Sequence, residues 1–102
     1  MIAKKWVLSF LVLFTILASS VFSNETRGLW VIRHYANTDA KIQTAVDYMV
    51  AHKLNTMLIQ IYGDSYALYN SSIAPKSYLC ASNFDALATA IQKCHAKGIK
   101  VY

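Results

Sequence analysis

Three short apolar runs are spaced along the chain after residue 27, with longer mixed segments between them. The runs cover residues 28–34, 56–62 and 99–102 and are rich in β-branched and aromatic side chains. Apolar runs bounded by polar residues are typical of strands that are buried on both faces, as in a parallel sheet. The pattern therefore predicts three buried strands.

The segment between the first two runs has the spacing of an amphipathic helix. Within residues 37–53, Ile42, Val46 and Met49 recur at intervals of four and three. Thr38 stands where its side chain can cap the first turn. We therefore expect a helix that buries these three apolar side chains.

The segment between the second and third runs predicts another helix. Within residues 83–98, Asp85 is placed to open the helix and Gly98 to end it. Strands alternating with helices, with short returns from helix to strand, are the signature of parallel β/α units with right-handed crossovers. The expected fold class is α/β, and we expect this βαβαβ chain to be the amino-terminal portion of a larger fold.

The start of the chain has the layout of a secretory signal peptide. Two lysines precede the apolar stretch 6–18, and small residues follow it. Cleavage after Ser20 or Ser23 would fit this layout. We take residues 1–23 as the signal peptide and residues 24–102 as the exported domain, either secreted, periplasmic or at the cell surface. The alternative is an uncleaved anchor, since the charge-free stretch is at the lower edge of what spans a bilayer.

Charge limits the classes of partner. Without the two lysines of the predicted signal peptide (residues 1–23), the formal net charge falls from +5 to +3, and the remaining basic residues are scattered. This pattern argues against a nucleic-acid surface. No spacing typical of metal ligands is present, so we expect neither a metal nor another cofactor, and contact with a membrane only through an uncleaved signal segment.

The chain has two cysteines, for which two states are open. Cys80 and Cys94 could form a disulfide in an oxidising compartment. Alternatively, Cys94 continues the apolar stripe of Leu87 and Ile91 and is a small buried hydrophobic residue.

The long connection after the second run is the candidate ligand-binding region. Residues 63–83 exceed the usual length of a structureless loop and are rich in tyrosine. In parallel β/α folds, connections that follow strands carry the ligand sites. Alternation along the second strand places Gln60 and Tyr62 on the face away from the helices, and the same parity places Val31 and Arg33 there.

Arg33 and Gln60 are costly to bury without polar partners at the ends of neighbouring strands. They could bind a polar ligand. They could equally form a structural network with Asp64 that holds the strand ends in register. Two roles are likewise open for the rings of Tyr66 and Tyr78. They could stack on a ligand, or they could only pack the loop against the rest of the fold.

Three stretches together resemble the start of the glycosyl hydrolase-like 10 domain family. They are RGLWVIRH from residue 27, NTMLIQIYGDSYALYNSSIAPKS from residue 55 and FDALATAIQKCHAKGIKVY from residue 84. The resemblance implies the first three strands and two helices of a (β/α)8 TIM-type barrel in a glycosidase of carbohydrate metabolism. It implies an exported protein whose substrate and partner is a polysaccharide or a cell-wall glycan. The positions matching the family's strand-end and loop motifs, expected to bind substrate, are Arg33, Gln60, Asp64, Tyr69 and Ser71.

The catalytic residues are not identified by this resemblance. Members of the family commonly have a histidine where this chain has Tyr102. Glycoside hydrolysis ordinarily needs two carboxyl groups flanking the bond, and only Asp64 is expected at the ligand end. Two functions therefore stay open: part of a glycoside hydrolase whose catalytic pair lies elsewhere, or a non-catalytic carbohydrate-binding or truncated barrel protein.

Overall fold

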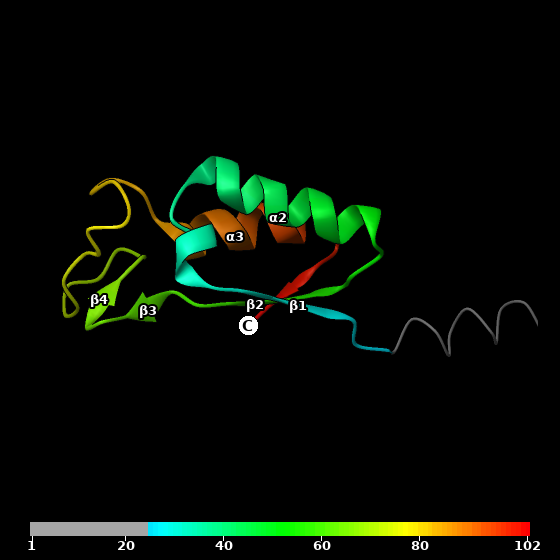
Figure 1. Cartoon of the computed structure of the whole chain (residues 1–102), viewed down its shortest axis with the longest axis horizontal. Helices are drawn as coiled ribbons and strands as arrows, with labels where there is room; N and C mark the ends of the chain where they lie inside the picture. Colours follow the sequence, from blue (N-terminus) through cyan, green and yellow to red (C-terminus); the bar gives the residue numbers. More distant parts are fainter. Residues whose placement is uncertain (1–24) are drawn as a thin grey trace, which may run out of the picture.

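Three parallel strands and two helices form the body of the molecule in the computed structural model, which describes residues 25–102 (Figure 1). The predicted signal peptide lies outside these residues. The strands pair in the order β1, β2, β5, and both neighbours are parallel. The elements of this body are β1 (Gly28–Val31), α2 (Asp39–Ala51), β2 (Thr56–Ile59), α3 (Ala86–His95) and β5 (Lys100–Val101). The predicted α/β class and the parallel order of the elements are confirmed.

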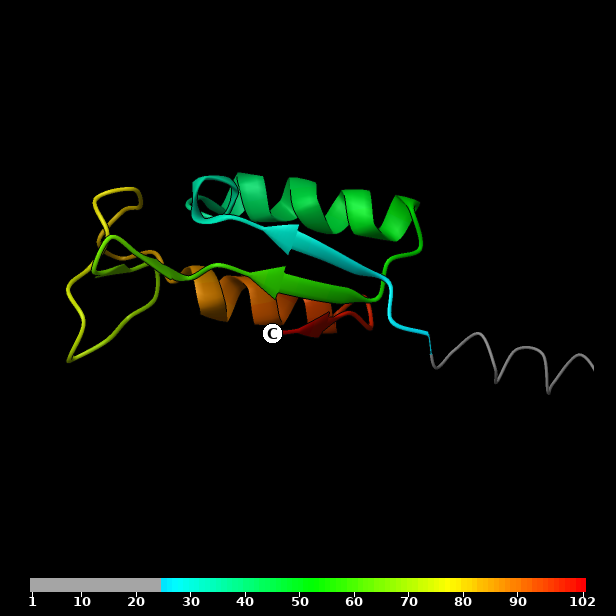
Figure 2. The same ribbon diagram turned by 60° about the horizontal axis from the view of Figure 1, so that its bottom comes forward.

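Both helices lie on the same face of the sheet, as Figures 1 and 2 show from two directions. The predicted helical positions Ile42, Val46 and Met49 are buried and form a single core cluster with Met57 of β2. The small residues of α3, among them Ala90, let the helix approach this cluster closely. The prediction that these three side chains form the buried face of the first helix is therefore confirmed.

Local capping explains where the helices begin and end. The Thr38 side chain accepts a hydrogen bond from the backbone N–H of Lys41 at 3.2 Å, and Asp85 accepts one from Ala88 at 2.9 Å. Gly98 follows α3 with a φ of 70°, a left-handed conformation that glycine adopts without strain. These caps confirm the predicted starts and the predicted stop.

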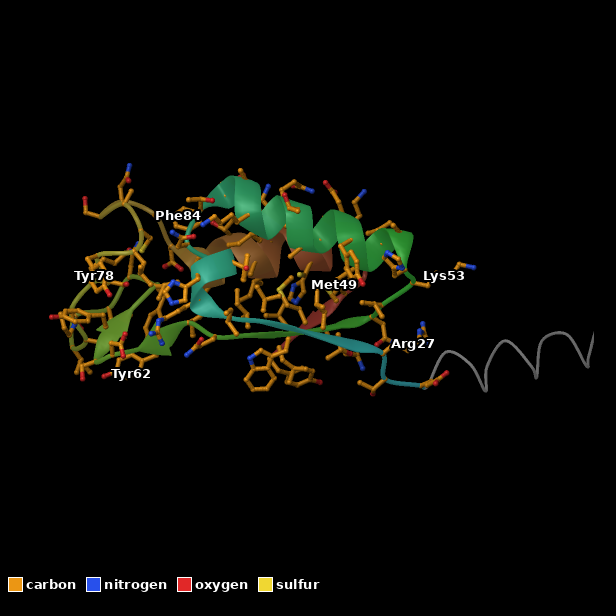
Figure 3. The ribbon with its side chains drawn as sticks, in the orientation of Figure 1. Arg27, Met49, Lys53, Tyr62, Tyr78 and Phe84 are labelled. Carbon is orange, nitrogen blue, oxygen red and sulfur yellow. The ribbon has the colours of Figure 1, made fainter. Side chains whose placement is uncertain are left out.

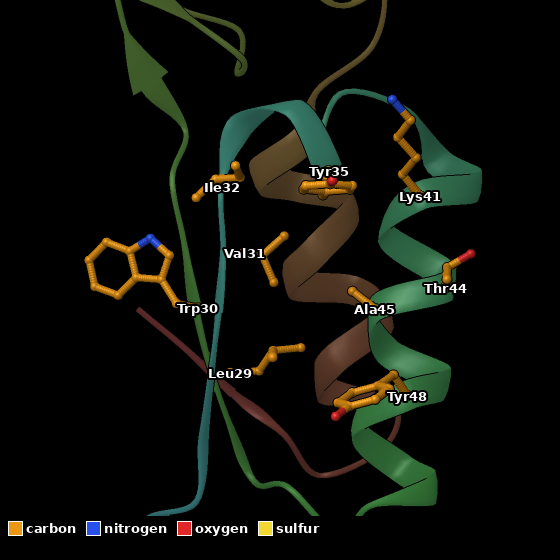
Figure 4. A pocket seen from close by; sticks show the side chains of 9 residues that line it. All are labelled: Leu29, Trp30, Val31, Ile32, Tyr35, Lys41, Thr44, Ala45 and Tyr48. Atoms are coloured by element: carbon orange, nitrogen blue, oxygen red, sulfur yellow. The ribbon is translucent and has the colours of Figure 1, made fainter.

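The first strand is shorter than predicted, and its side chains are on the opposite faces of the sheet from those predicted. It ends at Val31, and a single turn of 3-10 helix, η1 (Arg33–Tyr35), follows it. Val31 is in register with Ile59 and packs into the core under the helices, so the prediction that Val31 faces away from them is wrong. Figure 4 shows Trp30 on the opposite side of β1 from Val31. A run without polar alternation gives no indication of which side faces the helices.

The two cysteines are free thiols, so the disulfide alternative is not realised in this structure. Cys94 is fully buried, with its Sγ 3.8 Å from the Sδ of Met57. Burial raises the pKa of the Cys94 thiol above its ordinary value. Cys94 is therefore a small buried core residue, which confirms the alternative to a disulfide.

The sheet face opposite the helices is open. Trp30 on β1 is 68% exposed, and it is in register with Leu58 of β2. Tyr102, which follows β5, is 71% exposed. Parallel sheets are normally covered on both faces, so this half-covered sheet has room for further elements. Within residues 25–102, no helix is both long and apolar enough to span a membrane.

Candidate ligand-binding end of the sheet

The connections that follow β1 and β2 meet at one end of the sheet. After β2 the chain forms a small antiparallel hairpin of β3 (Tyr62–Gly63) and β4 (Tyr66–Ala67). Figure 3 shows Tyr62 and Tyr78 at this end, and Arg27 and Lys53 at the opposite end. The tyrosine-rich connection therefore lies beyond the carboxyl ends of the strands, where parallel sheets place their ligands.

The hairpin was not predicted, and its turn explains why. Asp64 and Ser65 occupy the two turn positions with φ values of 53° and 70°, the signs that a type I′ turn requires. Asparagine or aspartate followed by glycine is the usual sequence for this turn, and serine at the second position is a weak signal. The two strands are only two residues long, so no alternation of apolar and polar side chains indicates them.

Arg33 joins η1 to this hairpin. Its Nη2 lies 2.6 Å from the Oδ2 of Asp64, with the arginine side chain 20% exposed and the aspartate 61% exposed. The guanidinium also lies directly against Gly63, where a Cβ would collide with it. The Nε of Arg33 is buried and has no hydrogen-bond partner among the described residues.

Gln60 completes a network with these residues. Its Oε1 accepts a hydrogen bond from the backbone N–H of Arg33 at 3.1 Å. The Arg33, Gln60 and Asp64 network considered from the sequence is therefore present, and it ties the end of β1 to the start of the hairpin. These contacts give the three residues a structural role, and their predicted role in binding substrate stays a prediction.

Tyr69 and Ser71 lie farther along the same connection. Leu68 is fully buried in the core cluster, so it anchors the chain directly before the half-buried Tyr69. The Oγ of Ser71 accepts hydrogen bonds from the backbone N–H groups of Ile73 and Ala74, at 3.1 and 3.0 Å. Ser71 therefore stabilises a local turn, whatever else its hydroxyl binds.

Two charged side chains hold the base of the loop, and sequence reasoning missed this role for both. The Oδ2 of Asp85 accepts a hydrogen bond from the backbone N–H of Asn70 at 3.0 Å. The Nζ of Lys76 donates to the Oδ1 of Asn70 at 2.7 Å and to the backbone oxygen of Phe84. Asp85 was predicted only as a helix cap, and no sequence pattern indicates contacts that depend on how the loop folds back.

The tyrosines at this end differ in their packing. The rings of Tyr66 and Tyr78 meet edge to face with their centroids 6.0 Å apart. Tyr78 nevertheless stays 76% exposed, and the exposed Tyr62 lies on the neighbouring strand. These rings present apolar faces and hydroxyl groups to solvent, which suits a ligand that has both apolar and polar surfaces.

A separate groove of about 500 Å³ lies between β1 and α2 (Figure 4). Its walls are mostly apolar and include Leu29, Tyr35, Ala45 and Tyr48. None of the predicted site residues lines it. It follows the free edge of β1, so its position suits a packing surface for a further element of the fold better than a polar ligand.

The carboxylates near the loops have partners already. Asp64 is paired with Arg33. Burial tends to raise the pKa of Asp85, but hydrogen bonds from backbone N–H groups and the charge of Lys76 outweigh it and hold that pKa below its ordinary value. In the described part of the chain, no group of three or more histidine, cysteine, aspartate or glutamate residues is placed to hold a metal ion.

The class that the structure defines is a mixed α/β protein with a small parallel sheet and two helices on one face. A scan against models of known protein families finds no match to the chain, and a search of curated proteins finds none either. The resemblance to the glycosyl hydrolase-like 10 domain therefore stays a prediction, which rests on the motifs of the sequence.

Proposed function

We propose that this chain is the amino-terminal part of an exported glycoside hydrolase-like (β/α)8 barrel protein that binds a polysaccharide or a cell-wall glycan. The observation that carries the proposal is the tyrosine-rich connection beyond the carboxyl ends of parallel strands. Sugar rings have apolar C–H faces and polar edges, and a tyrosine matches both with its ring and its hydroxyl.

The open surfaces of the sheet support the barrel in this proposal. Trp30 and Tyr102 are largely exposed on or beside the uncovered face, which would turn inward in a closed barrel. The apolar groove beside β1 is where a neighbouring β/α unit would pack. Both surfaces would be covered by further strands and helices.

A non-catalytic carbohydrate-binding protein is the second candidate. The observation in its favour is that, among residues 25–102, the acidic side chains at the loop end are engaged in structural contacts. Asp64 pairs with Arg33, and Asp85 accepts hydrogen bonds from Asn70 and Ala88. A hydrolase would need its catalytic acid and base from other parts of the protein.

The test uses the complete exported protein and soluble chitohexaose, cellohexaose and peptidoglycan fragments as probes. Tyr69→Ala should weaken binding of the recognised glycan by about 1 to 3 kcal/mol, the range for a buried aromatic contact at a hot spot. Calorimetric titration measures the affinity, and chromatography of the incubated probe detects cleavage. Cleavage products identify a hydrolase, whereas binding without products favours the second candidate.

Val50→Ala is the control, because this exposed apolar residue lies on α2 and lines neither the loop nor the separate groove. It should leave glycan affinity unchanged. If Tyr69→Ala lowers the melting temperature and leaves glycan affinity untouched, the ring only supports the fold. If the wild-type protein binds none of the probes, the proposed function is wrong for these glycan classes.

A further inference from the structure

The loop over residues 69–84 is closed at its base by side chains. Asn70 stands at its start and Asp85 directly after its end, and they are joined through the backbone N–H of Asn70. Lys76 reaches from the middle of the loop to both ends, through the Oδ1 of Asn70 and the backbone oxygen of Phe84. We call this set of contacts among Asn70, Lys76, Phe84 and Asp85 the loop clasp.

Tyr69 lies between two fixed points. On one side, Leu68 is fully buried, and its backbone oxygen accepts the N–H of Ala86 at 2.8 Å. On the other side, Asn70 is held through its backbone and its side chain. A residue flanked by two anchored neighbours has little backbone freedom, so the clasp limits where the Tyr69 ring can point.

We propose that Lys76 and Asp85 are positioning residues that hold Tyr69 in its ligand-facing place through the loop clasp. The proposal rests on the proposed function for its consequence, since Tyr69 is the ring expected to stack on the sugar. The clasp itself is defined by contacts that do not involve a ligand. Pre-organising a binding loop reduces the entropy lost on binding and so strengthens affinity.

The chemistry of Asp85 suits this double role. One carboxylate oxygen caps α3 through Ala88, and the other accepts from Asn70. Lys76 is the charged group that acts on this carboxylate. Because these contacts hold the pKa of Asp85 below its ordinary value of 3.8, their stabilisation is fully present above that value. It is lost only as the pH falls through the still lower pKa of the folded state, so the clasp stays closed at neutral pH.

Asp85→Asn separates the two roles of this side chain. Asparagine caps a helix about as well as aspartate, so its one carbonyl oxygen can still accept from Ala88. Its amide nitrogen donates hydrogen bonds and so cannot accept one from Asn70. In the complete protein, amide hydrogen exchange at Asn70 should speed up about tenfold, the factor for one lost charge-assisted hydrogen bond, while Ala88 keeps its protection.

Lys76→Met removes the other half of the clasp and keeps most of the side-chain volume. It should also speed up exchange at Asn70, whereas Lys76→Arg should largely restore protection. Lys93→Met is the matched control, because Lys93 also bridges two elements: it joins α3 to Gln43 and Asp39 of α2, and neither partner is in the loop over residues 69–84. It should leave exchange at Asn70 unchanged.

Glycan affinity supplies the readout that a purely structural role would not move. Asp85→Asn should weaken binding of the recognised oligosaccharide about threefold to tenfold, and it should have no further effect in the Tyr69→Ala background. Unchanged exchange at Asn70 in both clasp variants overturns the clasp. Faster exchange with unaltered glycan affinity overturns the positioning role. If the wild-type protein binds no glycan probe, the proposed function fails, and exchange at Asn70 still decides whether the clasp holds the loop.

Discussion

At the scale of single residues, Gly63 sets how closely the hairpin approaches η1. The guanidinium of Arg33 lies on this glycine and reaches Asp64, 31 residues away in the chain. The backbone of Gly63 does not adopt a positive φ, so the need for glycine here comes from close contact. Any side chain at this position would have to displace the arginine.

We predict that Gly63→Ala destabilises the complete protein by about 1 kcal/mol or less, the range for a partly exposed ion pair. The new methyl group would push the Arg33 guanidinium away from Asp64. Chemical denaturation measures the change in the free energy of unfolding. In an Arg33→Ala background the same substitution should have a much smaller effect, because the colliding side chain is gone. Equal effects in both backgrounds would show that the added methyl group strains the backbone instead.

At the scale of elements, what could be predicted was what is local in the sequence. Both helices follow from apolar spacing and from the caps Thr38 and Asp85, which lie within a few residues of the bonds they accept. Which side chains of β1 face the helices could not be predicted, because every position from Leu29 to Ile32 is apolar. The loop clasp depends on contacts between residues that only the folded loop brings together. No local sequence pattern therefore predicts that Lys76 closes the loop.

The cap of α2 gives a prediction at this scale. Thr38→Ala should lower the free energy of unfolding by about 1 kcal/mol, because the backbone N–H of Lys41 loses its acceptor. Thr44→Ala is the matched control on the exposed face of the same helix, where the hydroxyl only donates to the backbone oxygen of Ala40. That change should be nearly neutral or slightly stabilising. Thermal unfolding of both variants measures the difference, and equal losses would contradict a capping role.

At the scale of the whole molecule, the sheet is covered on one face. The uncovered face and its surroundings expose Trp30 and Tyr102, and the groove beside β1 exposes further apolar surface. In the part of the chain that the structure describes, β1 and β5 each have one unpaired edge. Exposed apolar surface combined with free strand edges favours association over a stable monomer.

We predict that residues 24–102 expressed alone associate or unfold without a sharp transition. Replacing Trp30 and Tyr102 with glutamine should increase the monomeric fraction, because the apolar face becomes polar. Analytical ultracentrifugation and thermal melts measure the two properties. A sharp cooperative transition from a monomer of the unsubstituted segment would contradict the need for further covering elements, and with it the barrel that we propose.

The contacts of Asn55 bear on the order in which the chain becomes structured during synthesis. Its side chain accepts from the backbone N–H of Arg27, 28 residues earlier, and donates to the backbone oxygen of Glu25. Among residues 25–102, all the strand pairing of β1 is with β2, which leaves the ribosome later. The first strand therefore has no pairing partner until β2 has been synthesised. In the exported protein that we propose, an amino-terminal export signal would therefore be synthesised before β1 has its pairing partner.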